Sequence, residues 1–322
     1  MDATAALAAP AASGPALSGL HVPLVTPFTA QGDLAADALE GLAHQVLDDG
    51  ADGLVALGTT GEPGALEDEE RRAVVDVCVQ VCRERGASLV VGAGSSSTRA
   101  SVRELAALGG RPEIAAALVT VPSFVRPSEA GVLAHFGALA AHSPVPLVVY
   151  NIPYRTGQRI GADTLRELAA LPNIAGVKHA VGGIDADTVN LLADPPPASH
   201  GFAVLGGDDA YLPPLLALGG QGGILASAHL CTARWAELVA AWRDGDVARA
   251  RELGRGAVRL ASAVFTEPNP TVVKGVLHAQ GRIPSPDVRL PLLSASAAAV
   301  DAALYRATEW AEASPPAALA AV

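Results

Sequence analysis

The chain has 322 residues, 50% of them hydrophobic, and its formal net charge at pH 7 is -11. A chain of this size can bury a large core, and an acidic surface repels nucleic acids and anionic membranes. No apolar run reaches the roughly 18 residues that a membrane helix needs. We therefore expect neither nucleic acid nor a membrane as a partner.

The ends of the chain differ from the rest in composition. Residues 1–18 are rich in Ala and Pro and contain no Lys or Arg, so they lack the basic start of a secretory signal. We expect residues 1–18 and 313–322 to be disordered tails. The three cysteines form an odd count, which favours a reduced, cytoplasmic protein. Cys78 and Cys82 share one face of an expected helix, and we interpret them as buried small residues rather than metal ligands.

Short apolar runs recur along the chain, each followed by a segment with helical spacing. The runs are continuous rather than alternating, which is typical of parallel strands buried on both faces. They span 20–26, 52–58, 88–94, 114–121, 145–151, 174–178, 202–206 and 222–227. The helical segments between them span 33–49, 67–85, 98–108, 128–141, 163–170, 185–193 and 210–218. We expect helix N-caps at Asp33, Thr98, Ser128 and Asp163.

This alternation indicates an α/β fold. Eight strands with intervening helices favour a closed (β/α)8 TIM barrel over residues 19–230, because an open doubly wound sheet more often has about five or six strands. The segments 231–243, 246–265, 270–280 and 295–312 predict helices without a strand. We expect them to form a C-terminal helical extension, residues 231–312, that packs on the barrel.

Lysine is unusually scarce, since only Lys178 and Lys274 occur among the 22 basic residues. A guanidinium cannot act as a nucleophile at neutral pH, whereas a lysine amine can once burial lowers its pKa. The chemistry of such barrels occurs at the C-terminal ends of the strands. Lys178 ends the sixth apolar run, so we interpret it as a nucleophilic amine. The alternative is a lysine that merely reaches solvent from the end of a strand.

Polar residues also follow other strands. Tyr150 ends the fifth run, and its phenol can pass protons to and from a carbinolamine and an enamine. Thr59 and Thr60 lie between two glycines after the second run, where amides and hydroxyls can hold a carboxylate. A core tyrosine and an ordinary turn are the alternatives. The seventh run ends in Gly206-Gly207-Asp208-Asp209. The sequence contains neither a cofactor motif nor metal-ligand spacing, so we expect no cofactor and no metal.

Several stretches together resemble the dihydrodipicolinate synthase/N-acetylneuraminate lyase family of class I, Schiff-base-forming aldolases. The resemblance covers about Leu20 to Leu293. Its motifs are Gly58-Thr-Thr-Gly-Glu62, Tyr150-Asn-Ile-Pro-Tyr-Arg-Thr-Gly157, Gly176-Val-Lys178, Gly206-Gly-Asp-Asp209, and Glu267-Pro-Asn-Pro270 with Lys274. Each motif alone is weak, but their order and their spacing along a barrel are specific. The resemblance implies a lyase that acts on pyruvate or a related 2-oxo acid.

The resemblance also implies catalytic roles for single residues. Lys178 is similar to the family's Schiff-base lysine, and Tyr150 to its proton donor and acceptor. Thr59 resembles the hydroxyl that joins this tyrosine in a proton relay.

Further positions resemble the family's substrate-binding residues. Thr60 is similar to the residue that binds the oxo-acid carboxylate, and Ile224 to the position whose carbonyl faces bound pyruvate. Arg155 resembles the arginine that holds the carboxylate of the second substrate, and Gly206 is assigned to substrate binding as well. The family resemblance implies a homo-oligomer, either a dimer or a homotetramer, whose partners are a small 2-oxo acid and an aldehyde.

Two departures concern the second substrate. Ser123 and Phe124 stand where the synthase branch carries adjacent tyrosines, the second of which reaches into the neighbouring subunit's site. His179 follows the lysine at a position that is often Glu. We rank condensation of pyruvate with aspartate semialdehyde first. One alternative is a lyase or dehydratase for a 4-hydroxy-2-oxo acid or deoxy sugar acid, which Phe124 favours. Another is a non-catalytic oxo-acid sensor, which would not need the Lys178 amine.

Overall fold

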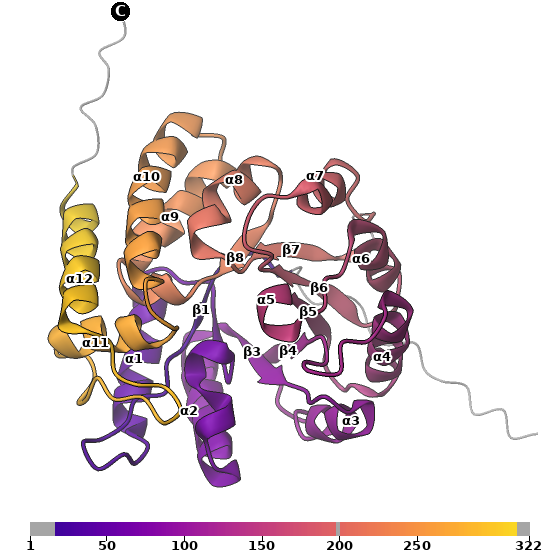
Figure 1. Ribbon diagram of the computed structural model, residues 1–322, viewed down its shortest axis with the longest axis horizontal. Helices are drawn as coiled ribbons and strands as arrows, with labels where there is room; N and C mark the ends of the chain where they lie inside the picture. The colour runs from indigo at the N-terminus through magenta and orange to yellow at the C-terminus, as the bar shows by residue number, and fades with distance from the viewer. Residues whose placement is uncertain (1–16, 198–199, 314–322) are drawn as a thin grey trace, which may run out of the picture.

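The computed structural model describes residues 17–197 and 200–313. Eight parallel strands close into a barrel, with β8 paired to β1, and helices surround it (Figure 1). This arrangement confirms the predicted (β/α)8 TIM barrel, and each predicted apolar run overlaps one strand. The strands are β1 (Gly19–Pro23), β2 (Gly53–Ala56), β3 (Ser88–Ala93), β4 (Ile114–Thr120), β5 (Leu147–Asn151), β6 (Ile174–His179), β7 (Ala203–Gly206) and β8 (Gly222–Ile224).

The helices of the barrel follow their strands in chain order. They are α1 (Ala36–Asp48), α2 (Asp68–Arg85), α3 (Thr98–Ala106), α4 (Glu129–His142), α5 (Pro153–Thr156), α6 (Ala162–Ala169), α7 (Ala186–Ala193) and α8 (Leu212–Ala217). The single turn α5 lies in a motif from which we had not predicted a helix. Cys78 and Cys82 are buried on α2, as predicted. Among the described residues, no helix is long and apolar enough to cross a membrane.

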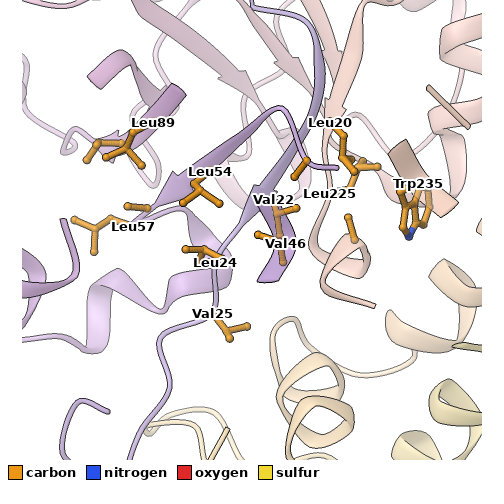
Figure 2. Packing of buried hydrophobic residues seen from close by; sticks show 14 of the residues in the cluster. Leu20, Val22, Leu24, Val25, Val46, Leu54, Leu57, Leu89, Leu225 and Trp235 are labelled. Atoms are coloured by element: carbon orange, nitrogen blue, oxygen red, sulfur yellow. The ribbon is translucent and has the colours of Figure 1, made fainter. Parts of the chain in front are cut away.

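The apolar strands are buried on both faces, which explains their continuous hydrophobic runs. One set of side chains fills the barrel interior, including Val55, Val90 and Leu118. A larger set packs between the barrel and its helices. Figure 2 shows part of that outer layer, where Leu20 of β1 and Trp235 belong to the same cluster. Because successive side chains of a strand point to opposite faces, each strand contributes to both layers.

The two predicted tails are described only in part. Of the predicted tail 1–18, only residues 17 and 18 are described, and Leu17, which precedes β1, is buried in the interior cluster. The predicted tail 313–322 lies outside the described residues except for Ala313.

Four helices follow β8 within residues 231–312, the segment that we predicted as a helical extension. They are α9 (Thr232–Arg243), α10 (Val247–Val264), α11 (Thr271–Ala279) and α12 (Ala297–Glu312). Trp235 of α9 meets Trp310 of α12 edge to face, with ring centroids 5.2 Å apart. Gly256 of α10 permits this packing, since a Cβ at that position would lie 2.1 Å from Trp310 Cδ1. The segment before α11 lines a cavity at the strand termini that carry the polar motifs, and the segment after α11 lines an adjoining cavity.

The N-cap predictions were correct only for Ser128, whose Oγ accepts a hydrogen bond from Gly131 N at 3.2 Å. The other helices begin at different residues: Ala35 precedes α1, Ser97 caps α3, and Gly161 precedes α6. Asp33 instead closes a turn by accepting from Thr29 N. Asp163 lies inside the first turn of α6, where a carboxylate is also favourable because of the helix dipole. The residue types alone do not show which of these neighbouring positions begins the helix.

Candidate active site

A cavity of about 590 Å³ opens at the C-terminal ends of the strands. Residues 261–269 of the extension line one side of it, and the rim of the barrel lines the rest. The structure brings six of the predicted site residues together in its wall: Thr59, Thr60, Tyr150, Arg155, Lys178 and Ile224. Loops after β2, β5, β6, β7 and β8 therefore converge on one site.

Lys178 lies on the inward face of β6. Its neighbour Val177 packs in the outer layer, and Ala180 lies in the interior cluster, so alternation along the strand places the lysine side chain inside. Lys178 is only 6% exposed, and Nζ lies 4.4 Å from the centroid of the Tyr150 ring. Within the described ranges, Nζ has neither a hydrogen-bond partner nor an ion-pair partner.

The electrostatic environment of Lys178 favours the free amine. Burial lowers the pKa of Lys178 to about 8, and the attraction of Asp209 and Asp208 only partly opposes this effect. At pH 7 about one lysine in ten would then be unprotonated, against about one in 3,000 at the ordinary pKa of 10.5. The residue is therefore suited to nucleophilic attack at neutral pH.

Tyr150 is the neighbour of Lys178 on the adjacent strand, since the two residues pair in the register of β5 and β6. Burial raises the pKa of the Tyr150 phenol above its ordinary value, while the Arg155 charge and the Thr59 hydroxyl act in the opposite direction. The phenol is consequently protonated at neutral pH. It can donate a proton to a group bound at Lys178 and receive one back.

The loop after β2 carries Thr59 and Thr60 in the 3-10 turn η1 (Thr59–Gly61). Thr60 is buried, and its Oγ1 accepts a hydrogen bond from Asn269 Nδ2 at 2.9 Å. The hydroxyl proton of Thr60 is therefore available for a bound anion, because a threonine hydroxyl donates as well as accepts. Thr26 Oγ1 donates to Gly61 O at 2.7 Å and holds the same turn from the β1 side.

Arg155 lies on the short helix α5 and is exposed. Its Nε donates to Tyr154 Oη at 2.9 Å, and the guanidinium lies over the Tyr154 ring, 5.0 Å from the centroid. Arg155 lines the Lys178 cavity and also an adjoining cavity of about 520 Å³. A cation at this mouth can receive the carboxylate of a second substrate.

Gly206, which we assigned to substrate binding, is not among the residues that line this cavity. A Cβ at Gly206 would point at Leu212 Cδ1 and Leu215 Cδ2, at 2.9 and 3.1 Å, away from the cavity. The next residue, Gly207, lines the cavity, and a Cβ there would lie 2.9 Å from Lys178 Cε. The adjacent glycines looked equivalent in sequence, but alternate residues of a strand face opposite sides.

Two acidic residues after β7 also line the cavity, and we had given them no role. Asp209 is buried, and its Oδ2 accepts from Ser227 N at 2.7 Å and from Ser227 Oγ at 2.5 Å. Burial raises the pKa of Asp209 to about 6. Asp208 Oδ2 accepts from Gly182 N at 2.6 Å, and burial raises its pKa as well. Among the charged groups around Lys178, these two carboxyl groups oppose the lowering of its pKa most strongly.

His179 points away from the cavity. Its Nε2 lies 2.9 Å from Thr188 Oγ1 of α7, and Nδ1 lies 3.5 Å from Asn151 Nδ2. Burial lowers the pKa of His179 to about 4, so the ring is neutral at physiological pH. Histidine in place of the usual glutamate at position 179 therefore changes the layer between the barrel and its helices, not the surface that meets a substrate.

Phe124 lies in the loop 121–127 and is 95% exposed. It does not line the cavity of its own chain. Its backbone has φ of +69°, a left-handed conformation that non-glycine residues seldom adopt. The neighbouring Val125 is also exposed, so the loop presents apolar surface to the outside of this chain.

The barrel, its lysine and the tyrosine on the next strand define a class I aldolase. The chain matches the model of the dihydrodipicolinate synthetase family over residues 16–305, and it belongs to that family. It is 39% identical to the 4-hydroxy-tetrahydrodipicolinate synthase of Syntrophus aciditrophicus over 85% of this chain and 91% of that protein. The protein of the same name from Moorella thermoacetica is 40% identical, with the same coverage of each chain.

Solved structures agree with this assignment. Dihydrodipicolinate synthase from Thermotoga maritima superposes with a TM-score of 0.87 and 29% identity, covering 92% of this chain and 99% of that chain. The enzyme from Acinetobacter baumannii complexed with pyruvate gives a TM-score of 0.84 and 31% identity, covering 91% of this chain and 98% of that chain.

Proposed function

We propose that this protein is a 4-hydroxy-tetrahydrodipicolinate synthase, which condenses pyruvate with aspartate semialdehyde through an imine on Lys178. One observation carries the assignment of the nucleophile: a buried lysine, with no anionic contact partner in the described part of the chain, lies 4.4 Å from the centroid of the ring of a buried tyrosine. The names of the relatives support the choice of reaction.

In the first step, the free amine of Lys178 attacks the ketone carbon of pyruvate. A carbon–nitrogen bond forms, and the ketone oxygen leaves as water after receiving protons. We assign the proton transfers to Tyr150, with Thr59 as its relay partner, because both line the same cavity and the Thr59 hydroxyl acts on the phenol. The Thr60 hydroxyl and the amides of its loop hold the pyruvate carboxylate, and the carbonyl of Ile224 faces the bound oxo acid.

In the second step, the protonated imine accepts electrons as a C3 proton leaves, which gives an enamine. The enamine carbon then attacks the aldehyde carbon of aspartate semialdehyde, and the aldehyde oxygen takes up a proton. Arg155 holds the carboxylate of this second substrate at the mouth of the cavity. Holding both reactants in one cavity supplies much of the acceleration through proximity. The amino group of the semialdehyde part then attacks the imine carbon, which closes the ring of the product and releases Lys178 as the free amine.

We further propose that the enzyme works in the cytoplasm as a homo-oligomer, a dimer or a tetramer. Its free thiols, Cys78, Cys82 and Cys231, fit a reducing compartment. The exposed apolar side chains of Phe124 and Val125 fit a surface that a second subunit covers.

A second candidate activity is the cleavage or dehydration of a 4-hydroxy-2-oxo acid or deoxy sugar acid. Phe124 favours it, because a phenylalanine from a neighbouring subunit brings no hydroxyl to the proton relay. The same imine chemistry would serve both reactions.

A panel of aldehydes, each offered together with pyruvate, distinguishes these activities. We expect pyruvate to be consumed fastest with aspartate semialdehyde, and Arg155→Ala to slow that reaction far more than imine formation with pyruvate alone. Efficient cleavage of a 4-hydroxy-2-oxo acid, with no turnover of the semialdehyde, would reverse the ranking. No consumption of pyruvate with any aldehyde, together with no cleavage of a 4-hydroxy-2-oxo acid, would contradict both proposals.

A further inference from the structure

The second lysine of the chain, Lys274 of α11, is fully buried in an ion pair. Its Nζ lies 2.9 Å from Glu62 Oε1, and Glu62 is buried as well. The other carboxylate oxygen, Oε2, accepts from Arg289 N at 2.9 Å. Glu62 directly follows the turn that carries Thr59 and Thr60. Both oxygens of this glutamate are therefore held by residues of the C-terminal extension, more than 200 positions away in sequence.

The surroundings of the pair leave it little freedom. Phe28 lies under both cations, with Lys274 Nζ at 4.1 Å and the guanidinium carbon of Arg289 at 4.4 Å from the ring centroid. Arg289 in turn donates to both oxygens of Glu70 at 2.5 and 2.6 Å. A buried charge whose partner is removed is costly, so each member of this cluster depends on the others.

The backbone of the Thr59–Thr60 loop needs such support. Leu57 and Glu62, which bracket it, have φ values of +55° and +53°, and neither is glycine. Left-handed backbone at non-glycine residues persists where surrounding contacts hold it, and it is frequent at functional sites. The contacts here are the Lys274–Glu62 ion pair, the hydrogen bond from Asn269 to Thr60, and the hydrogen bond from Thr26 to Gly61.

We propose that Lys274 is a positioning residue of the active site. Together with Glu62 and Asn269, it holds the loop in the geometry in which Thr60 and the loop amides receive the carboxylate of the oxo acid. This inference rests on the function proposed above. Lys178 stands on β6, outside this cluster, so the reactivity of its amine is expected to be independent of Lys274. Both lysines of the chain then serve the same site: Lys178 is the nucleophile, and Lys274 is a buried counter-charge.

The test compares pyruvate with methyl pyruvate, which has the same ketone but no carboxylate charge. The initial rate of borohydride-trapped adduct on Lys178 is measured for each compound by peptide mass spectrometry. In Lys274→Met we expect the pyruvate rate at low concentration to fall by about tenfold, which is the order of one lost charge-assisted hydrogen bond. The rate with methyl pyruvate is expected to stay within about twofold, because Lys178 is untouched.

Two further variants keep the test valid if Lys274→Met does not fold. Asn269→Ala removes the hydrogen bond to Thr60 without exposing a buried charge, and Glu62→Gln keeps the size of the glutamate. Both variants are expected to lower the preference for pyruvate over methyl pyruvate, as Lys274→Met does. Arg249→Met is the matched control, because it breaks ion pairs with Glu237 and Glu252 inside the extension, away from the loop. Its preference for pyruvate is expected to equal that of the wild type.

A lower melting temperature with an unchanged preference for pyruvate in Lys274→Met, Asn269→Ala and Glu62→Gln would show that the cluster is only structural, and would overturn this inference alone. A wild type that forms no adduct with pyruvate would overturn the proposed function and this inference with it.

Discussion

At the scale of single residues, the two lysines show what burial can and cannot indicate. Both are 6% exposed or less, yet Lys274 contacts a carboxylate, whereas Lys178 contacts none among the described residues. Burial lowers the pKa of both amines, but at Lys274 the Glu62 carboxylate at 2.9 Å opposes this effect directly and favours the ammonium. Their scarcity drew attention to both residues in the sequence. The partner that distinguishes them lies far away in the chain and became visible only in the fold.

Tyr150 tests the proposed proton relay. Replacing Tyr150 by Phe removes one hydroxyl and should lower turnover by about 10²–10⁴, which is the usual contribution of general acid–base catalysis. The fold should survive, because the ring still fills its place in the barrel interior. Steady-state kinetics and circular dichroism of the variant check both expectations. Near-normal turnover would show that the tyrosine has only a packing role.

At the scale of elements, the sequence located the strands better than it located their faces. Continuous apolar runs predicted all eight strands, but such runs carry no alternation from which the inward side could be read. Gly206 and Gly207 show the consequence, because the predicted glycine faces α8 and its neighbour faces Lys178. His179 shows it again, since this residue next to the nucleophile belongs to the outer layer. Three of the four predicted N-caps were also displaced by one or two residues, because α1 and α6 begin after Ala35 and Gly161, which carry no capping side chain, and α3 begins after Ser97.

The loop 121–127 gives a prediction at this scale. Phe124 is almost fully exposed in the single chain, so Phe124→Tyr adds a hydroxyl without a clash. If a neighbouring subunit receives this side chain beside its Tyr150, the new hydroxyl should raise condensation of pyruvate with aspartate semialdehyde. A tenfold increase in kcat/KM would correspond to about 1.4 kcal/mol of transition-state stabilisation.

Kinetics of the Phe124→Tyr variant, together with its mass in solution, provide the check. Phe124→Leu is the matched control, since it removes the ring and adds no hydroxyl. Equal rates in the wild type and the tyrosine variant would show that the missing hydroxyl does not limit this enzyme.

At the scale of the whole molecule, the barrel with its extension could be predicted because strand and helix signals repeat regularly along the chain. The contribution of the extension to the site could not be predicted in the same way. Asn269 and Lys274 belong to a motif that was recognised, but their contacts with Thr60 and Glu62 join segments more than 200 residues apart. Such pairs depend on how the extension docks on the barrel, which no local pattern encodes.

Buried histidines couple the stability of the whole fold to pH. Burial lowers the pKa of both His179 and His229 to about 4. These folded-state values lie below the unfolded value of about 6.5. The contribution of each neutral histidine to the free energy of unfolding is therefore complete above about pH 6.5 and is lost as the pH falls towards 4. The loss is on the order of 3 kcal/mol for each histidine. Asp209, whose pKa is raised to about 6, acts in the opposite direction over part of this range.

Denaturant unfolding of the wild type and of His179→Gln, at several pH values between about 7.5 and 4.5, isolates the histidine contribution. The glutamine can keep a hydrogen bond to Thr188 but does not titrate. We expect a shallower loss of unfolding free energy with acid in the variant than in the wild type. Parallel pH profiles would contradict the linkage.

Reductive trapping shows whether Lys178 forms an imine with a 2-oxo acid. The protein is treated with pyruvate and borohydride, digested, and its two lysine-containing peptides are examined by mass spectrometry. We expect a reduced pyruvate adduct on Lys178, none on Lys274, and none in Lys178→Arg, because a guanidinium stays charged and is a poor nucleophile. No adduct on the wild-type protein, or an adduct on Lys274 alone, would show that Lys178 is not the nucleophile.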